Sequence, residues 1–105
     1  TIRRLHVLHN HERVRHGLRP LEIDSEMCLV AQRHAVWMSK NGFFQHSNAG
    51  YAENIHQQVI SAEAAVAGWL NSPGHRANVL GGYQKAGFGY YRTAQGNARW
   101  VVVFR

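Results

Sequence analysis

The stretch ARWVVVFR, residues 98–105, is apolar at every position from Trp100 to Phe104. Successive side chains of a strand point to opposite faces, so a strand of this composition must be covered on both sides. The stretch KAGFGYYRT, residues 85–93, precedes it across a short polar turn at 95–97, and the two predict a β-hairpin. We therefore expect a central strand with other elements packed on both of its faces.

Helical patterns occupy much of the remaining chain. The first segment lacks Gly and Pro and ends at Gly17, the second begins at Asp24 or Ser25 and ends at Gly42, and the third begins after Ser61. Helices on both faces of a small, mainly antiparallel sheet form an α+β, three-layer α-β-α sandwich, here as one domain over residues 1–105. The expected elements are helices over residues 2–16, 25–41 and 62–71, one helical turn within 75–80, and a strand over 53–60.

Two glycines in GFGYY, Gly87 and Gly89, do not form a phosphate loop, because the third glycine and the following helix of that motif are missing. We expect them to let the strand and a helix approach closely. The single Cys28 lies within a helix, and no Gly-x-Ser-x-Gly elbow is present. We interpret Cys28 as a small core residue and not as a nucleophile.

Composition excludes several classes of protein. The 105 residues are 45% hydrophobic, without an apolar run long enough to cross a bilayer. The net charge of +6 favours anionic partners, but the basic residues are scattered, so we expect no specific nucleic-acid binding. We expect a monomer, and because the chain begins with Thr1 and shows no leader, a mature form or an excised domain. A lone cysteine leaves the cellular compartment open.

The first helix carries HNHERVRH, which differs from the His-Glu-x-x-His motif of zinc proteases because His11 and His16 are five residues apart. We interpret its histidines, and His34, as surface or half-buried residues satisfied by hydrogen bonds, and His56 as a surface residue. Val7 and Val14 lie on a second apolar face of this helix. That pattern predicts a helix contacted from two sides.

His46, Glu53 and His75 are the candidates for a functional site. Both histidines lie in turns, and Glu53 begins a strand whose inward face would carry it inward as well. Two imidazoles and a carboxylate can form the first shell of a zinc site, and a glutamate beside an imidazole can act as a general base for a bound water. Three separate polar residues in loops are the competing interpretation, and spacing alone leaves the choice open.

Taken together, five segments give the chain a strong resemblance to the CAP superfamily, which comprises the cysteine-rich secretory, antigen 5 and pathogenesis-related 1 proteins. It is most similar to the disulfide-free bacterial branch. The segments follow the family order over nearly the whole chain, and are LHNHERVRHGLRPLEID (8–24), AQRHAVWMSKNGFFQHS (31–47), YAENI (51–55), AVAGWLNSPGHRANVL (65–80) and the closing GFGYY and WVVVF.

The resemblance implies an α-β-α sandwich and a central cleft with two histidines and two acids, implicated in binding a divalent metal, with zinc the first expectation. By motif these are His46, Glu53 and His75, while Ser72 stands where the second acid is expected. The tetrad is thus reduced to a triad, which should weaken metal affinity. Asn78 matches a cleft position where an amide is common.

The resemblance also implies a secreted or cell-envelope protein. We expect binding of a ligand or partner, such as a lipid, a peptide or a cell-surface ligand, through the cleft formed by His46, Glu53, Ser72, His75 and Asn78. A metal-dependent hydrolase with Glu53 as general base is one alternative. A structural or adhesion module with a vestigial cleft is another. The missing acid and the lack of a Ser or Cys nucleophile in the motifs favour binding over catalysis.

Overall fold

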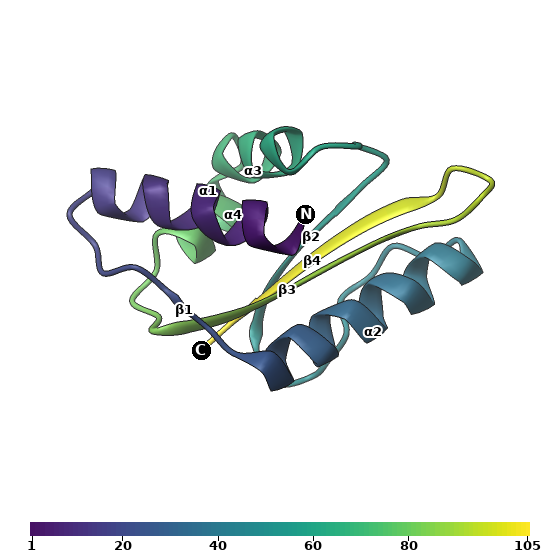
Figure 1. Ribbon diagram of the computed structural model, residues 1–105, viewed down its shortest axis with the longest axis horizontal. Helices are drawn as coiled ribbons and strands as arrows, with labels where there is room; N and C mark the ends of the chain where they lie inside the picture. Colours follow the sequence, from purple (N-terminus) through teal and green to yellow (C-terminus); the bar gives the residue numbers. More distant parts are fainter.

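A computed structural model describes all residues, 1–105. Figure 1 shows helices both above and beneath a twisted sheet. No helix combines the length and the apolar character needed to span a membrane. The elements, in order, are α1 (Ile2–Arg15), β1 (Glu22–Ile23), α2 (Ser25–Asn41), β2 (Ala52–Gln57), α3 (Ala62–Leu70), α4 (Pro73–Val79), β3 (Lys85–Arg92) and β4 (Ala98–Phe104).

The four strands lie in the order β1-β3-β4-β2, so the predicted central strand is confirmed as β4. It pairs antiparallel with β3, where Phe88 lies opposite Val102, and antiparallel with β2, where Ile55 lies opposite Val101. Only the two-residue β1 is parallel to its neighbour. The hairpin and the mainly antiparallel sheet are therefore both confirmed.

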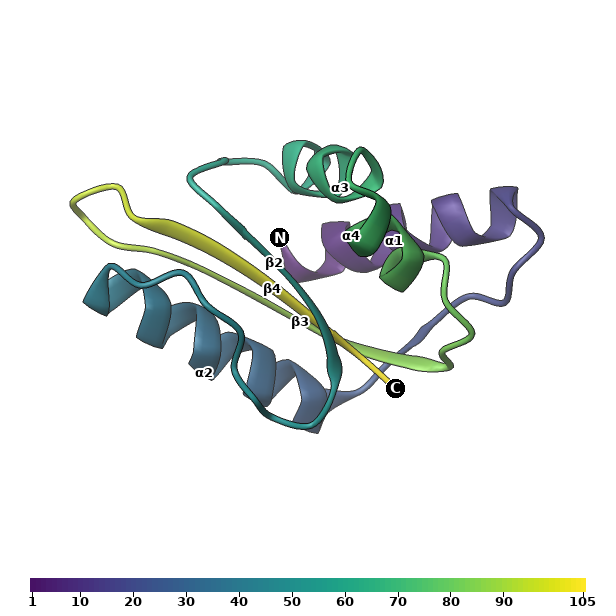
Figure 2. The same cartoon turned by 180° about the vertical axis from the view of Figure 1, so that it is seen from behind.

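Alternate residues of β4 enter two separate hydrophobic clusters. Trp100, Val102 and Phe104 join the cluster that also contains residues of α1 and α3. Val101 and Val103 join the cluster that also contains residues of α2. Seen from behind in Figure 2, α2 again lies alone on its side of the sheet, with α1, α3 and α4 on the other. The three-layer sandwich follows from the two apolar faces of this one strand.

The close approach of α2 to β3 depends on glycine. A Cβ atom added at Gly87 would lie 2.1 Å from the carbonyl carbon of Met27, and one at Gly89 would lie 2.5 Å from that of Ala31. Both neighbours are helix backbone, which cannot move aside without displacing α2. The expected role of these two glycines is confirmed.

Side chains of α2 complete the outer edge of β3. Beyond the short β1, the amide of Phe88 donates to Cys28 Sγ at 3.4 Å. The side-chain amide of Gln32 then accepts from the Tyr90 amide at 2.8 Å and donates to the Tyr90 carbonyl at 2.8 Å. This edge of the sheet is thus hydrogen-bonded by a helix in place of a further strand.

The outer edge of β2 is completed in the same way by α3 and α4. Trp69 Nε1 donates to the Ile55 carbonyl at 3.0 Å, and Asn78 Nδ2 donates to the Glu53 carbonyl at 3.4 Å. The indole is buried, with 1% of the residue's surface exposed. Neither edge of the sheet therefore exposes a continuous row of unpaired backbone N–H and C=O groups.

Arg13 connects α1 to the end of α4 and to the segment that follows it. Its guanidinium is buried, and it donates to the carbonyl oxygens of Val79 at 2.9 Å, Gly81 at 2.7 Å and Tyr83 at 3.1 Å. A further bond reaches the Arg19 carbonyl at 2.9 Å. Burying this cation is tolerable because carbonyl oxygens take up its N–H groups.

Three predictions about individual elements need correction. Val7 and Val14, on the second apolar face of α1, are 49% and 57% exposed, so the helix is contacted from one side only. The strand expected over residues 53–60 ends at Gln57, because Gln58 has a positive φ of 65°. The helical turn expected within residues 75–80 is the longer α4, which begins with a proline in its first turn.

Candidate functional site

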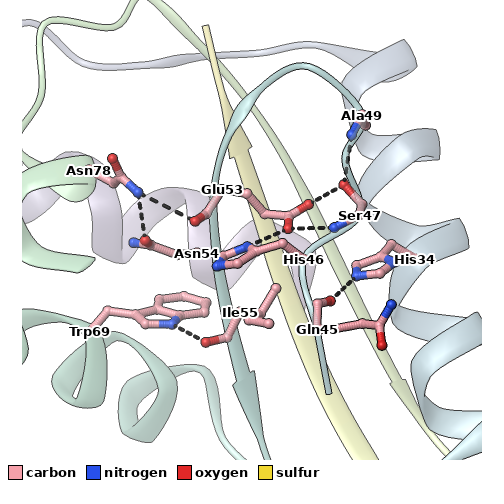
Figure 3. Close-up of polar contacts among 10 residues, drawn as sticks. All are labelled: His34, Gln45, His46, Ser47, Ala49, Glu53, Asn54, Ile55, Trp69 and Asn78. Carbon is pink, nitrogen blue, oxygen red and sulfur yellow. Dashed lines mark hydrogen bonds and ion pairs between the residues drawn. The ribbon is translucent and has the colours of Figure 1, made fainter. Parts of the chain in front are cut away.

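His46 and Glu53 form a direct pair. His46 lies in the loop after α2, and its Nδ1 is 2.7 Å from Glu53 Oε1. The same carboxylate accepts from the Ser47 amide at 3.0 Å and from the Ser47 hydroxyl at 2.5 Å. Figure 3 shows His46 and Ser47 converging on Glu53. The expectation that Glu53 points inward is met, since only 5% of its side chain is exposed.

This geometry fixes the role of each group. A carboxylate only accepts hydrogen bonds, so His46 Nδ1 carries the proton and donates it toward Glu53. The His46 side chain is 61% exposed, and its Nε2 makes no hydrogen bond within the chain. Glu53 is therefore an orienting group with both oxygens engaged, and His46 presents its Nε2 to the outside.

His34 supports the loop that carries His46. His34 Nε2 lies 2.6 Å from the Gln45 carbonyl, one residue before His46. The imidazole also stacks on Trp37, with the ring centroids 5.7 Å apart. The expectation of a hydrogen-bonded histidine is met here, and the bond gives His34 a part in placing the site.

Ser72 and His75 form the second half of the site. Ser72 precedes α4, and its hydroxyl lies 2.9 Å from His75 Nδ1. His75 Nε2 makes no hydrogen bond within the chain. Burial lowers the pKa of His75 below its ordinary value, and the charges of nearby His46 and His56 lower it further. A neutral His75 is thus favoured near pH 7, and its Nε2 is open to a ligand.

The two halves are held by consecutive residues of β2 that point to opposite faces. The Glu53 side chain binds His46 and Ser47, whereas Asn54 Nδ2 donates to the His75 carbonyl at 3.0 Å. Asn54 is fully buried. The period-two alternation that predicted an inward Glu53 also places Asn54 on the other face, and this was the signal that could have identified it.

A pocket of about 290 Å³ opens beside Ser72 and His75. His46, Glu53 and Asn78 do not line it. Its floor includes Trp69 and Ile55, so polar groups surround an apolar base. The complete lining is Phe44, Ile55, His56, Gln57, Gly68, Trp69, Ser72 and His75.

His56 is a lining residue that the sequence interpretation missed. It was expected at the surface, but it is half-buried against α3. A Cβ added at Gly68 would lie 2.4 Å from His56 Nε2, so the missing side chain of Gly68 makes the space for this ring. Gly68 inside a helix was the available signal, because a glycine there costs helix stability unless packing requires it.

Asn78 was expected to line the cleft, and it instead contacts the sheet edge. Its side-chain amide donates to the Glu53 carbonyl and, at 3.0 Å, to Asn54 Oδ1. These bonds keep α4 against β2. The residue therefore supports the backbone beneath both halves of the site.

The residues proposed as metal ligands do not meet as a set of three. No group of three or more His, Cys, Asp or Glu side chains lies close enough together to hold an ion. Glu53 in particular has both oxygens committed to His46 and Ser47. The donor atoms that remain are the Nε2 atoms of His46 and His75.

His9 differs from what was expected of the histidines in α1. It is completely buried, and its ring contacts the rings of Trp69, Phe88 and Phe104. Its Nδ1 bonds to the Leu5 carbonyl at 2.8 Å, but Nε2 is buried with no partner. Burial lowers the pKa of His9 to about 4, so the ring is neutral and belongs to the core and not to the site.

Known proteins are similar to this chain in sequence and in fold. The family model described as "CAP: Cysteine-rich secretory protein family" matches residues 7–104. The membrane protein YlbC of Bacillus subtilis is 35% identical over 109 residues, which cover 84% of this chain and 32% of YlbC. The chain thus spans about a third of the length of this relative.

Two solved structures resemble the chain over nearly its whole length. An extracellular protein containing an SCP domain from Bacillus anthracis is 29% identical, with a TM-score of 0.84, and the match covers 99% of this chain and 40% of that protein. An outer surface protein from Borrelia burgdorferi has a TM-score of 0.88 at 24% identity, covering 97% of this chain and 89% of that one, and shows the shared fold. With the family match over residues 7–104, these similarities establish that the chain is a member of the CAP family.

Proposed function

We propose that this chain is an extracytoplasmic CAP domain that binds a ligand or partner at the cleft around His46, Glu53 and His75. The observation that carries the proposal is the anchoring of two imidazoles through Nδ1, His46 by Glu53 and His75 by Ser72. Each keeps its Nε2 free, and the pocket beside His75 has an apolar floor. Fixed polar groups over an apolar base are the usual features of a ligand site.

The compartment is supported by the relatives. The similar structures include an extracellular protein and an outer surface protein. A peptide, a lipid or another cell-surface molecule with a hydrogen-bonding group is the class of ligand we propose. Phe44 and Trp69 would contact its apolar part, and His75 its polar group.

A more specific proposal is that the same cleft binds zinc. The three-residue set does not fit the ion, but His46 and His75 could contribute Nε2, with Glu53 and Ser72 as the groups that orient the rings. Two imidazoles leave the remaining positions to water or to the ligand, so the affinity should be weak. A general base at Glu53 has little support, because its carboxylate is buried and takes three hydrogen bonds.

Calorimetric titration with zinc at neutral pH tests the metal. We expect saturable uptake by the wild type and its loss in His46→Ala and in His75→Ala. Glu53→Gln should weaken uptake by about 10-fold or more, the usual effect of removing a group that orients a ligand. His11→Ala, on the exposed side of α1, is the matched control. A wild type that takes up no zinc at millimolar concentration removes the metal from the proposal.

Ligand binding without metal is tested by NMR with a fragment library. Fragments that bind should shift the ring signals of His75 and His56, and Gly68→Ala, which crowds His56, should abolish those shifts. If no fragment shifts either ring, or if the shifts persist unchanged in Gly68→Ala, the pocket is not the binding site. Gly74→Ala serves as the control, because a Cβ there meets nothing within 4 Å.

A further inference from the structure

The outer face of α2 carries two large apolar side chains that are exposed among charged ones. Leu29 is 54% exposed and Trp37 is 41% exposed, although both are large hydrophobic residues on the longest helix of the chain. Figures 1 and 2 both show α1, α3 and α4 on the opposite side of the sheet from α2, so no other helix covers it. Large apolar side chains exposed together with charged ones on one helix face are features of a polar interaction surface.

Charged residues on this face have an arrangement that is symmetric about its centre. Arg33 lies in the middle, Glu26 is seven residues before it and Lys40 is seven residues after it. The apolar residues repeat the symmetry, since Leu29 is four residues before Arg33 and Trp37 is four residues after it. All five are exposed, and at 3.6 residues per turn they share one stripe of the helix.

We propose that two copies of the chain associate through α2, packed antiparallel about a twofold axis that passes at Arg33. A twofold axis places a residue n positions before Arg33 beside the residue n positions after it in the second copy. Glu26 then lies beside Lys40 of the second copy, and Leu29 beside Trp37. Each pair occurs twice, so the face complements itself in charge and in apolar contact.

The shape of the face fits such packing. A hollow of about 410 Å³ lies between Leu29 and Lys40 along the helix, and Val36 and Trp37 also line it. Trp37 is held in place by the stacked His34 and by Phe43, whose ring centroid is 5.2 Å away. The hollow can therefore receive Leu29 of the second copy without a rearrangement of the indole.

Three features limit the strength of this association. Arg33 meets its own copy at the axis, and two chains of net charge +6 repel one another. One helix from each copy also buries less surface than a standard interface. We therefore expect a dissociation constant on the order of 0.1 mM, where the first expectation from sequence was a monomer.

Sedimentation equilibrium up to about 1 mM protein in low salt tests the proposal. Glu26→Lys should weaken association by about 10-fold, because it faces Lys40, and Lys40→Glu should weaken it equally. The double variant restores opposite charges in both pairs and should recover the wild-type constant within about twofold. All substituted side chains are exposed, so folding is not at risk, and circular dichroism verifies it.

Further variants separate this arrangement from other occupants of the face. Leu29→Asp should abolish association, while Val14→Asp, on the exposed apolar side of α1, should not change it. Arg33→Gln removes the like charges at the axis and should tighten association, whereas it would weaken the binding of an acidic partner. A wild type that stays monomeric at about 1 mM, a double variant that fails to recover, or weakening by Arg33→Gln would overturn the proposal.

Discussion

The two edges of the sheet are completed by the same device and have different surroundings. At β3, Cys28 and Gln32 of α2 supply the missing hydrogen bonds, and the pocket of about 590 Å³ that they also line contains no histidine or acid. At β2, Trp69 and Asn78 supply the bonds, and His75 lies between them in the sequence. The candidate site is thus located where an edge is covered by two short helices and not by one long one.

The difference separates residues that support the sheet from residues available to a ligand. Asn78 contacts only the backbone and Asn54, as Gln32 does with Tyr90 on the opposite edge. Ser72 and His75 bond to one another and leave a ring nitrogen free. An amide close to a cleft can therefore be structural, and the test is whether its hydrogen bonds reach the backbone of an edge strand.

Disrupting the contact between α2 and β3 should lower the stability more than any other change considered below. Gly87→Ala places a Cβ against the backbone of Met27, so α2 must move away and the bonds of Cys28 and Gln32 lengthen. We expect the free energy of unfolding to fall by about 3 kcal/mol, at the upper end of overpacking effects. Denaturant titration measures it. Gly74→Ala, near the β2 edge, meets nothing and should change stability by less than about 0.5 kcal/mol.

Lowering the pH should destabilise both edges of the sheet, because the titrating residue, His9, lies in the core between them. The pKa of His9 is lowered to about 4 by burial, with smaller effects from the charges of His6 and Arg13. The unfolded chain therefore takes up a proton at this ring below about pH 6.5, while the folded chain resists it. Stability should fall by about 3 kcal/mol between about pH 6.5 and 4.

His9→Leu isolates this effect. Leu has nearly the volume of His and no buried nitrogen, so the unpaired Nε2 is removed along with the titration. Stability measured by denaturant titration at several pH values should become much flatter between about pH 6.5 and 4. An unchanged slope in the variant would assign the acid sensitivity to other groups.

Gln32→Met sharpens the comparison at the β3 edge by removing polar atoms at nearly constant volume. Tyr90 would lose partners for both its amide and its carbonyl, at a cost of about 2 kcal/mol. Hydrogen exchange at the Tyr90 amide should accelerate by more than the exchange of amides in β4. Arg33→Met, at the next position and exposed, is the control. Equal losses in the two variants would contradict the role of Gln32.

Asn78→Ala should have the smallest effect, about 1 kcal/mol, since its bonds are 3.4 and 3.0 Å long. If Asn78 supports the β2 edge, the substitution lowers the free energy of unfolding, and fragment binding at His75 changes little. The reverse outcome, weaker fragment binding at unchanged stability, would return Asn78 to the ligand cleft.

The parts of the fold that were predictable depend on local pattern. The two-sided apolar run in β4 required helices on both faces, and the glycines of β3 required close contact with one of them. The two-residue β1 could not be predicted, because it forms only by pairing with Lys85 and Ala86. The exposed Val7 and Val14 have the same periodicity as buried residues, and sequence alone cannot supply a missing neighbour.

The sequence named the residues of the candidate site but not what each of them contacts. Family motifs identified His46, Glu53, Ser72 and His75, and the structure brings them together as two pairs. That Glu53 orients an imidazole depends on Ser47 taking its second oxygen, which no spacing rule specifies. His56 was missed because its burial depends on Gly68, twelve residues later.

The buried Arg13 has a consequence for the order in which the protein assembles. Three of the carbonyl oxygens it binds belong to Val79, Gly81 and Tyr83, which are 66 to 70 residues further along the chain. During synthesis, α1 leaves the ribosome long before these acceptors exist, so Arg13 cannot bind them until α4 and the segment that follows it have been made. Of the helices in this domain, α1 is therefore made first and is among the last to be held in place.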